Sequence, residues 1–80
     1  MYYVYVIYSP SHNRYYKGLT QDIEKRLREH NQGHTRSTKA FKPWVLVYHE
    51  TFADIGEARK REKYFKTAAG RRYLRDKTVP

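Results

Sequence analysis

The chain has 80 residues, and its 17 Lys and Arg against eight Asp and Glu give a formal net charge of +9. This length leaves room for a single domain over residues 1–80 with a modest core, because so short a chain buries only about 60% of its unfolded surface. It has no cysteine, which excludes disulfides and thiolate zinc sites. No apolar run approaches the roughly 20 residues that a membrane span needs.

The charge balance predicts the kind of partner. An excess of positive charge on a small surface favours polyanions, nucleic acid first among them, and we expect no membrane partner. Charge alone also allows a ribosome-associated basic protein or a merely cationic surface. The lack of cysteine agrees with a cytoplasmic protein, and the N-terminus lacks the basic region and cleavage site of a signal peptide.

The first 19 residues predict a β-hairpin. Residues 2–8 are β-branched or aromatic without interruption, which favours a strand that is covered on both faces. A turn follows by composition, and residues 14–19 return as the second strand. Tyr5 and Tyr16 are then expected near each other across the hairpin. Gly18 allows a close backbone approach where this strand ends.

A helix is predicted next, over residues 22–31. Asp22 is a good N-cap, and Gly33 suits a left-handed cap after the last turn. Arg26 and His30 are four residues apart, so they project from one face of this helix, one above the other. We expect that face to meet the end of the second strand.

The second half of the chain predicts one more strand and two more helices. A polar loop is expected over residues 34–43, followed by the third strand over residues 44–48. A capping box that begins at Asp54 predicts the start of a second helix. We expect Gly70 to break that helix, and residues 71–77 to form a short terminal one.

Together these elements resemble the GIY-YIG nuclease domain, and more closely its small stand-alone members of the UPF0213 type. The resemblance runs from Tyr2 to about Leu74, and it is carried by segments in the expected order and spacing: Tyr3-Val4-Tyr5, Tyr16-Lys17-Gly18, E-K-R-L-R-E-H-N, S-T-K, K-P-W and K-R-E-K-Y. It implies an α+β fold, a three-stranded antiparallel β-sheet flanked by helices in the order β-β-α-β-α-α. It also implies metal-dependent cleavage of phosphodiester bonds.

The resemblance assigns catalytic roles to five residues. Tyr5 and Tyr16 correspond to the tyrosines of the two half-motifs, and Arg26 to the family's helix arginine. His30 corresponds to the histidine one turn later, where it would share proton transfer or orient a tyrosine. Glu62 corresponds to the single metal-binding glutamate, which implies Mg²⁺ (or Mn²⁺) as cofactor.

The sequence also departs from the family pattern at four places. Tyr3 stands where the first half-motif has glycine, and Val4 where isoleucine is usual. Lys17 stands where the second half-motif has isoleucine. Many members carry an asparagine about a dozen residues after the glutamate, and the region of Leu74 offers none.

The chemistry of phosphodiester hydrolysis suits these residue types. Magnesium often uses only one or two protein carboxylates, so Glu62 alone can hold it. The planar fork of Arg26 matches phosphate geometry. Tyr5 can act as a base only if nearby cations lower its pKa from about 10, and we expect Arg26 and Lys17 to do so. Tyr16 would then position the water or the phosphate.

Each of these residues also has an ordinary structural explanation in isolation. The tyrosines suit a half-buried strand, and Arg26 suits the surface of a helix. His30 suits a cationic cap near a helix C-terminus, and Glu62 an ion pair on a solvated face. Their joint occurrence in the family's order favours the active site.

Further cations are expected to bind nucleic-acid phosphates: Lys17, Arg36, Lys39, Lys42, Arg59, Lys63 and Lys66. The loop segment 37–39 either grips phosphates or is a mobile polar loop. Aromatic residues interleave the basic run from Arg59 to Lys77, namely Tyr64, Phe65 and Tyr73. These rings either stack on unpaired bases or pack the helices on the sheet, and we favour packing.

The sequence therefore predicts a metal-dependent DNA endonuclease of low sequence specificity, in DNA repair or recombination, with any selectivity directed at branched or single-stranded structures. A nucleic-acid-binding module without useful catalysis is the first alternative. A basic protein that docks on the ribosome or another partner is the second. The chain is expected to be a monomer or a weak homodimer.

Overall fold

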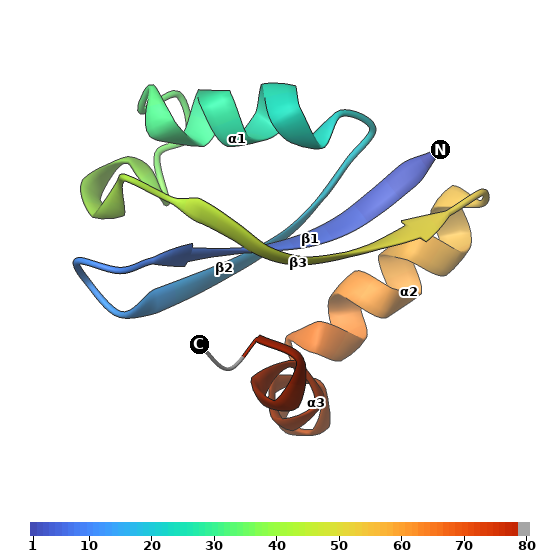
Figure 1. Ribbon diagram of the computed structural model, residues 1–80. Coiled ribbons are helices and arrows are strands. Elements are labelled where there is room, and N and C mark those ends of the chain that lie inside the picture. The colour runs from blue at the N-terminus through green and yellow to red at the C-terminus, as the bar shows by residue number, and fades with distance from the viewer. Residues whose placement is uncertain (79–80) are drawn as a thin grey trace.

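The computed structural model describes residues 1–78, and these form three strands and three α-helices around one sheet (Figure 1). The elements follow in the predicted order, with a short 3-10 helix at Lys39–Phe41 added before the third strand: β1 (Tyr2–Ser9), β2 (Arg14–Thr20), α1 (Ile23–Asn31), β3 (Val45–Phe52), α2 (Ile55–Phe65) and α3 (Ala68–Thr78). The sheet is antiparallel with the strand order β2-β1-β3, which confirms the predicted α+β fold.

The central strand β1 is buried on both faces, as its sequence predicts. Figure 1 shows α1 over one face of the sheet and α2 with α3 over the other. Because side chains alternate along a strand, Val4 and Val6 join the core under α2 and α3, and Tyr5 and Ile7 join a second cluster under α1. The two faces of β1 thus hold two separate cores.

Local capping signals begin α1 and α2, and end α1, where the sequence predicts. The Asp22 side chain accepts a hydrogen bond from the Lys25 amide, and that of Asp54 accepts one from the Glu57 amide. Gly33 follows α1 with φ of 81°, the left-handed conformation that glycine adopts at low cost.

The third strand differs from the prediction at both ends. It begins at Val45 and not at Trp44, and it continues to Phe52 because it pairs with β1 along almost its whole length, as far as Tyr2. Trp44 lies buried before the strand, where its indole N–H donates to the Thr38 carbonyl over 2.9 Å.

The expectation that Gly70 breaks a helix is wrong. The helices are separated at Lys66 and Thr67, and Gly70 is buried within α3. A Cβ at Gly70 would lie 2.6 Å from the Tyr64 carbonyl carbon and 2.7 Å from Phe65 Cα. The glycine therefore serves close packing of α3 against the end of α2.

The aromatic residues of the basic run pack the helices on the sheet, as we favoured. Phe65 is fully buried and stacks on Tyr73, with ring centroids 6.1 Å apart. Tyr64 and Tyr73 are partly buried against the same core. The Arg61 guanidinium lies over all three rings and pairs with Glu50 at 2.8 Å, so this cation is part of the scaffold.

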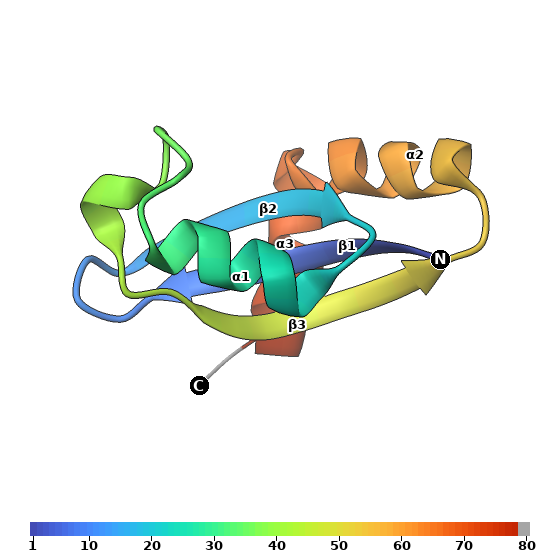
Figure 2. The same cartoon turned by 90° about the horizontal axis from the view of Figure 1, so that it is seen from above.

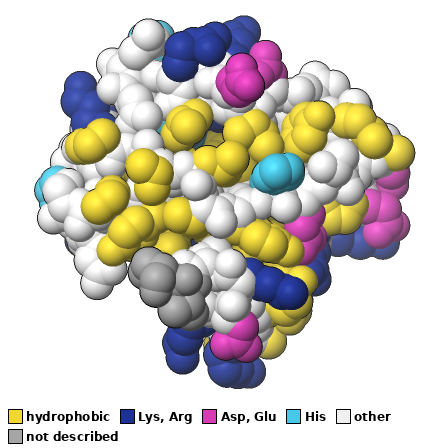
Figure 3. Space-filling view, in the orientation of Figure 1, with side chains coloured by type: hydrophobic (Ala, Val, Ile, Leu, Met, Phe, Trp, Pro, Cys, Tyr) yellow, Lys and Arg dark blue, Asp and Glu magenta, His cyan; other side chains and the backbone are white. Residues whose placement is uncertain are grey.

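Two further observations concern the surface of the molecule and the length of its helices. On the face seen in Figure 3, hydrophobic side chains spread over the middle and Lys and Arg lie mainly toward the rim. No helix within residues 1–78 is both long enough and apolar enough to cross a membrane.

Candidate active site

The centre of the candidate site is a buried hydrogen-bonded chain that joins β1, α1 and the following loop. The Tyr5 hydroxyl lies 2.8 Å from His30 Nε2, and His30 Nδ1 lies 2.7 Å from the Thr38 hydroxyl. His30 and Thr38 are fully buried, and Tyr5 is 2% exposed. Tyr5 extends over Gly18 of the neighbouring strand, which has no side chain to block it.

Thr38 is a site residue that the sequence reasoning missed. Its side chain is neither a free phosphate grip nor part of a mobile polar surface, because it is buried against His30. The loop is held in place by Asn31, whose amide bonds both the N–H and the carbonyl of Trp44. A histidine on the inner face of a helix needs a buried polar partner, and this need is the signal by which the loop hydroxyls could have been found.

Tyr16 lies beside this chain, as the hairpin predicts. Its ring centroid is 5.1 Å from that of His30 and 6.5 Å from that of Tyr5. Tyr16 stands opposite Ile7 in the ladder and Tyr5 stands opposite Gly18, so the two tyrosines are diagonal neighbours on one face. The structure thus brings Tyr5, Tyr16 and His30 together.

Arg26 borders this cluster from α1. It is half-buried, and its Nη1 donates to Glu29 Oε1 over 3.0 Å. Its charge favours ionisation of the Tyr5 hydroxyl, but burial acts more strongly and raises the pKa of Tyr5 to about 12. The expectation of a lowered pKa for Tyr5 is therefore wrong for the protein alone.

His30 is neutral at physiological pH. Burial, and to a lesser extent the nearby Arg26 charge, lower the pKa of its imidazole to about 4, against a small opposing effect of Glu29. In a neutral imidazole one nitrogen donates and the other accepts. Since the Thr38 hydroxyl can donate to the Thr35 carbonyl at 3.4 Å, we assign the proton to Nδ1, so that Nε2 accepts from Tyr5. His30 therefore does not act as the charged cap of a helix C-terminus, which was its structural explanation in isolation.

Glu62 lies on the helix that covers the other face of the sheet from α1. That helix, α2, runs alongside the β2 edge in Figure 2. Its side chain is 24% exposed, and its Oε2 is 3.5 Å from Lys66 Nζ. The Glu62 charge makes the smallest of the contributions that raise the pKa of Tyr5, which places the carboxylate within electrostatic reach of the hydroxyl without direct contact.

This arrangement fits a magnesium site of one particular kind. Within residues 1–78, no group of three or more His, Asp or Glu side chains is placed to hold a metal ion. Glu62 is thus a single partly exposed carboxylate, and such a donor suits Mg²⁺ only where water and substrate phosphate supply the other oxygens.

The cations predicted to bind nucleic acid do not form one groove. Lys17 faces away from Tyr5, on the side of its ladder partner Val6, with which it lines a pocket. Arg59 and Lys63 are exposed on α2, on the other side of the sheet from α1. The cations of the loop that follows α1 are exposed as well: Arg36, Lys39 and Lys42. Their role in binding stays a prediction.

The three-stranded antiparallel sheet flanked by helices is the fold that the resemblance to the GIY-YIG domain implied. The family model of the GIY-YIG catalytic domain matches residues 1–74. The chain belongs to the GIY-YIG family, which is a family of nucleases.

Individual relatives confirm the resemblance to UPF0213 proteins. The chain is 38% identical to a UPF0213 protein of Staphylococcus haemolyticus over 74 residues, which cover 91% of this chain and 89% of that protein. It is 47% identical to one of Bacillus pumilus over 53 residues, 65% of this chain but only 54% of that relative's length. The solution NMR structure of a UPF0213 protein from Bacillus halodurans superposes with a TM-score of 0.60 at 27% identity, covering all of this chain and 89% of the other.

Proposed function

We propose that the protein is an endonuclease that hydrolyses phosphodiester bonds of DNA with low sequence specificity, depends on Mg²⁺ (or Mn²⁺), and serves DNA repair or recombination. One observation carries the proposal. The Tyr5 hydroxyl is held by the neutral, fully buried His30 and lies over Gly18, with Arg26 on one side and Glu62 within electrostatic reach.

Arg26 and Glu62 supply the two charges that a phosphodiester substrate requires. Arg26 would bind the phosphate and stabilise the charge that develops on it, and Glu29 holds the guanidinium in position. Glu62 would hold the divalent cation. When bound, such a cation acts as a Lewis acid toward the phosphoryl oxygen.

The tyrosine and histidine form the path for the proton. Tyr5 keeps its proton at neutral pH, because its pKa is raised to about 12. The attacking water would therefore pass its proton to the Tyr5 oxygen while the Tyr5 proton moves to His30 Nε2. The negative charge of a bound phosphate favours the imidazolium that forms, which offsets the effect of burial. Tyr16 would position the water.

A binding module without useful catalysis is the second candidate. The observation that favours it is the Glu62 carboxylate, whose described partner is the Lys66 ammonium at 3.5 Å. A carboxylate that stays paired with Lys66 is not free to hold a metal ion.

Cleavage assays test the proposal. Labelled single-stranded, duplex, flap and four-way-junction DNAs are incubated with Mg²⁺ or Mn²⁺ and the parent, Glu62→Gln or Arg26→Ala. Glu57→Gln, an exposed glutamate of the same helix, is the matched control. Cleavage lost in both site variants and kept in the control, with DNA binding retained by Glu62→Gln, supports the nuclease. Binding without cleavage of any substrate favours the second candidate, and cleavage by both site variants overturns the site.

A further inference from the structure

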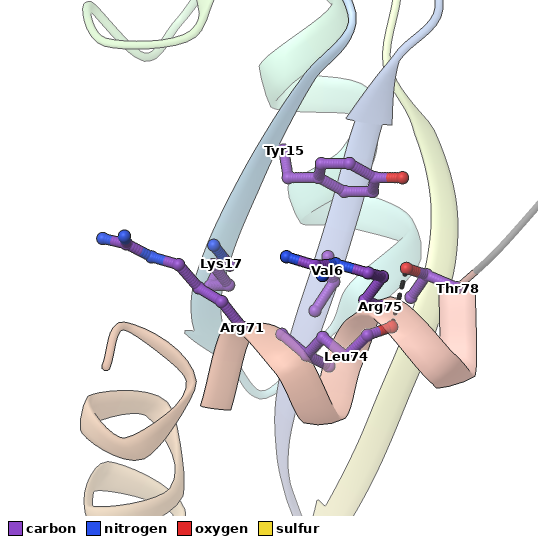
Figure 4. A pocket seen from close by; sticks show the side chains of 7 residues that line it. All are labelled: Val6, Tyr15, Lys17, Arg71, Leu74, Arg75 and Thr78. Atoms are coloured by element: carbon purple, nitrogen blue, oxygen red, sulfur yellow. Dashed lines mark hydrogen bonds between the residues drawn. The ribbon is translucent and has the colours of Figure 1, made fainter. Parts of the chain in front are cut away.

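A second pocket lies on the face of the sheet opposite Tyr5 and His30. Figure 4 shows it between the β1–β2 hairpin and α3. The cavity measures about 300 Å³. Its lining combines apolar, aromatic and basic side chains, none of which belongs to the catalytic residues assigned above: Val6, Tyr15, Lys17, Arg71, Leu74, Arg75 and Thr78.

The charged part of this lining is entirely positive. Lys17, Arg71 and Arg75 belong to it, no acidic side chain does, and none of these cations forms an ion pair with another residue within 1–78. Burial and the neighbouring charges of Arg71 and Lys66 lower the pKa of Lys17. Cations held together in this way repel one another, and a bound anion relieves that repulsion.

The uncharged part of the lining joins a buried apolar floor to one exposed aromatic ring. Val6 is fully buried and Leu74 is 4% exposed, so they close the pocket from below. Tyr15 is 42% exposed, and its ring packs on Tyr8 with centroids 4.8 Å apart. Tyr15 is thus supported on one side, while its ring borders the pocket in Figure 4.

We propose that this pocket binds one nucleotide of a single-stranded nucleic acid. The phosphate would lie among Arg71, Arg75 and Lys17, and the base would pack against Tyr15 and Leu74. The volume is at the lower end of the range for ligand pockets, about 300–1,000 Å³, which suits one nucleotide and excludes a double helix. Stacking on an aromatic ring next to a basic groove is a general way to hold single strands without sequence preference.

The position of the pocket also gives it a route to the active site. Lys66 lies within electrostatic reach of Lys17 and bonds Glu62 at 3.5 Å, so positive charge continues from the pocket around the β2 edge. A single-stranded nucleic acid bound in the pocket would therefore extend toward Glu62. The binding proposed here does not require cleavage and goes beyond the proposed catalytic function.

Binding of a labelled single strand tests the proposal separately from catalysis. Fluorescence anisotropy follows titration of fluorescein-labelled dT12 without divalent cations, on the Glu62→Gln background. We expect Arg71→Gln combined with Arg75→Gln to weaken binding at least tenfold, and to reduce the slope of log K against log salt by about 1.4, since each single-strand phosphate contact contributes about 0.7. Tyr15→Leu should weaken binding about fivefold or more, by loss of stacking.

Matched controls separate the pocket from net charge. Lys60→Gln combined with Arg72→Gln removes the same charge from exposed helix positions outside the pocket and should change binding less than twofold. Equal weakening by the two double variants would overturn the proposal, because it would show attraction by net charge alone. Unchanged binding by the Arg71 and Arg75 double variant would overturn it as well.

A measurement on the unmutated pocket tests the proposal even if the pocket variants fail to fold. Amide NMR shifts are followed on the Glu62→Gln protein with dT12, thymidine monophosphate and inorganic phosphate as probes. We expect dT12 to shift Leu74 and Thr78, and phosphate alone to shift them much less. Shifts of the same residues by thymidine monophosphate would support the proposal, because one nucleotide fills the pocket, whereas equal shifts by inorganic phosphate would overturn it. Shifts confined to the surroundings of His30 would overturn the proposal.

Discussion

Gly18 lies opposite Tyr5 in the ladder between β1 and β2, and the Tyr5 ring crosses it so closely that a Cβ on Gly18 would be 2.6 Å from Tyr5 Cζ. The Tyr5 ring occupies the space that a side chain on Gly18 would fill. Because of it, the Tyr5 hydroxyl reaches His30 and the edge of β2, and the site depends on glycine at this position.

The change Gly18→Ala tests that dependence. The new methyl group would push the Tyr5 ring away from His30, and overpacking of this kind costs about 1–3 kcal/mol of unfolding free energy. Urea unfolding measures the loss, and we expect cleavage to fall with it. Gly56→Ala is the control, since its Cβ would meet only the end of the Asp54 side chain, at 3.2 Å. Equal stability of the two variants would contradict the prediction.

His30 makes stability depend on acid pH. Its pKa is about 4 in the folded protein and 6.5 in the unfolded chain, so between these values the unfolded chain binds more protons. The contribution of His30 to the free energy of unfolding is therefore fully present above about pH 6.5 and falls as the pH is lowered. By pH 4 about 3 kcal/mol of it is lost. The difference in urea unfolding between pH 7 and pH 4 should be smaller in His30→Gln by about that amount. His34→Gln, which replaces an exposed histidine of the loop after α1, is the matched control.

Removal of the Thr38 hydroxyl tests the far end of the hydrogen-bonded chain. Thr38→Val leaves the Nδ1–H of His30 buried without its acceptor, which costs about 1–3 kcal/mol. Nitrogen-15 NMR of the imidazole should show the Nδ1–H tautomer in the parent and a mixture in the variant. Thr51→Val, on the exposed side of β3, is the control and should stay within about 0.5 kcal/mol. A parent histidine with its proton on Nε2 would refute the assigned direction of the chain.

Gly70→Ala should destabilise the protein although the position is helical. Alanine within a helix ordinarily gains about 0.5–1 kcal/mol over glycine. Here the added Cβ would lie 2.7 Å from Phe65 Cα and would collide with the Tyr64 carbonyl, so α3 has to move away from α2. We expect a net loss of about 1–3 kcal/mol in thermal or urea unfolding. A stabilised variant would show that α3 adapts without cost.

The sequence by itself predicted the order of the elements and several of their boundaries, and it named most residues of the candidate site. Asp22, Asp54 and Gly33 act locally, because a cap or a left-handed turn needs only neighbouring residues, and the structure confirms all three. The spacing of Arg26 and His30 likewise places them on one helical turn without knowledge of the fold. The family resemblance supplied Tyr5 and Glu62, which no local pattern distinguishes from structural residues.

Only the tertiary structure decided what surrounds these side chains. The raised pKa of Tyr5, the lowered pKa of His30 and the burial of Thr38 each depend on elements that are distant in sequence. Gly70 resembles a helix breaker until α2 is seen to pack against it. Desolvation and close contact are properties of the assembled core, and a linear pattern shows which residues can meet but not how completely the meeting excludes water.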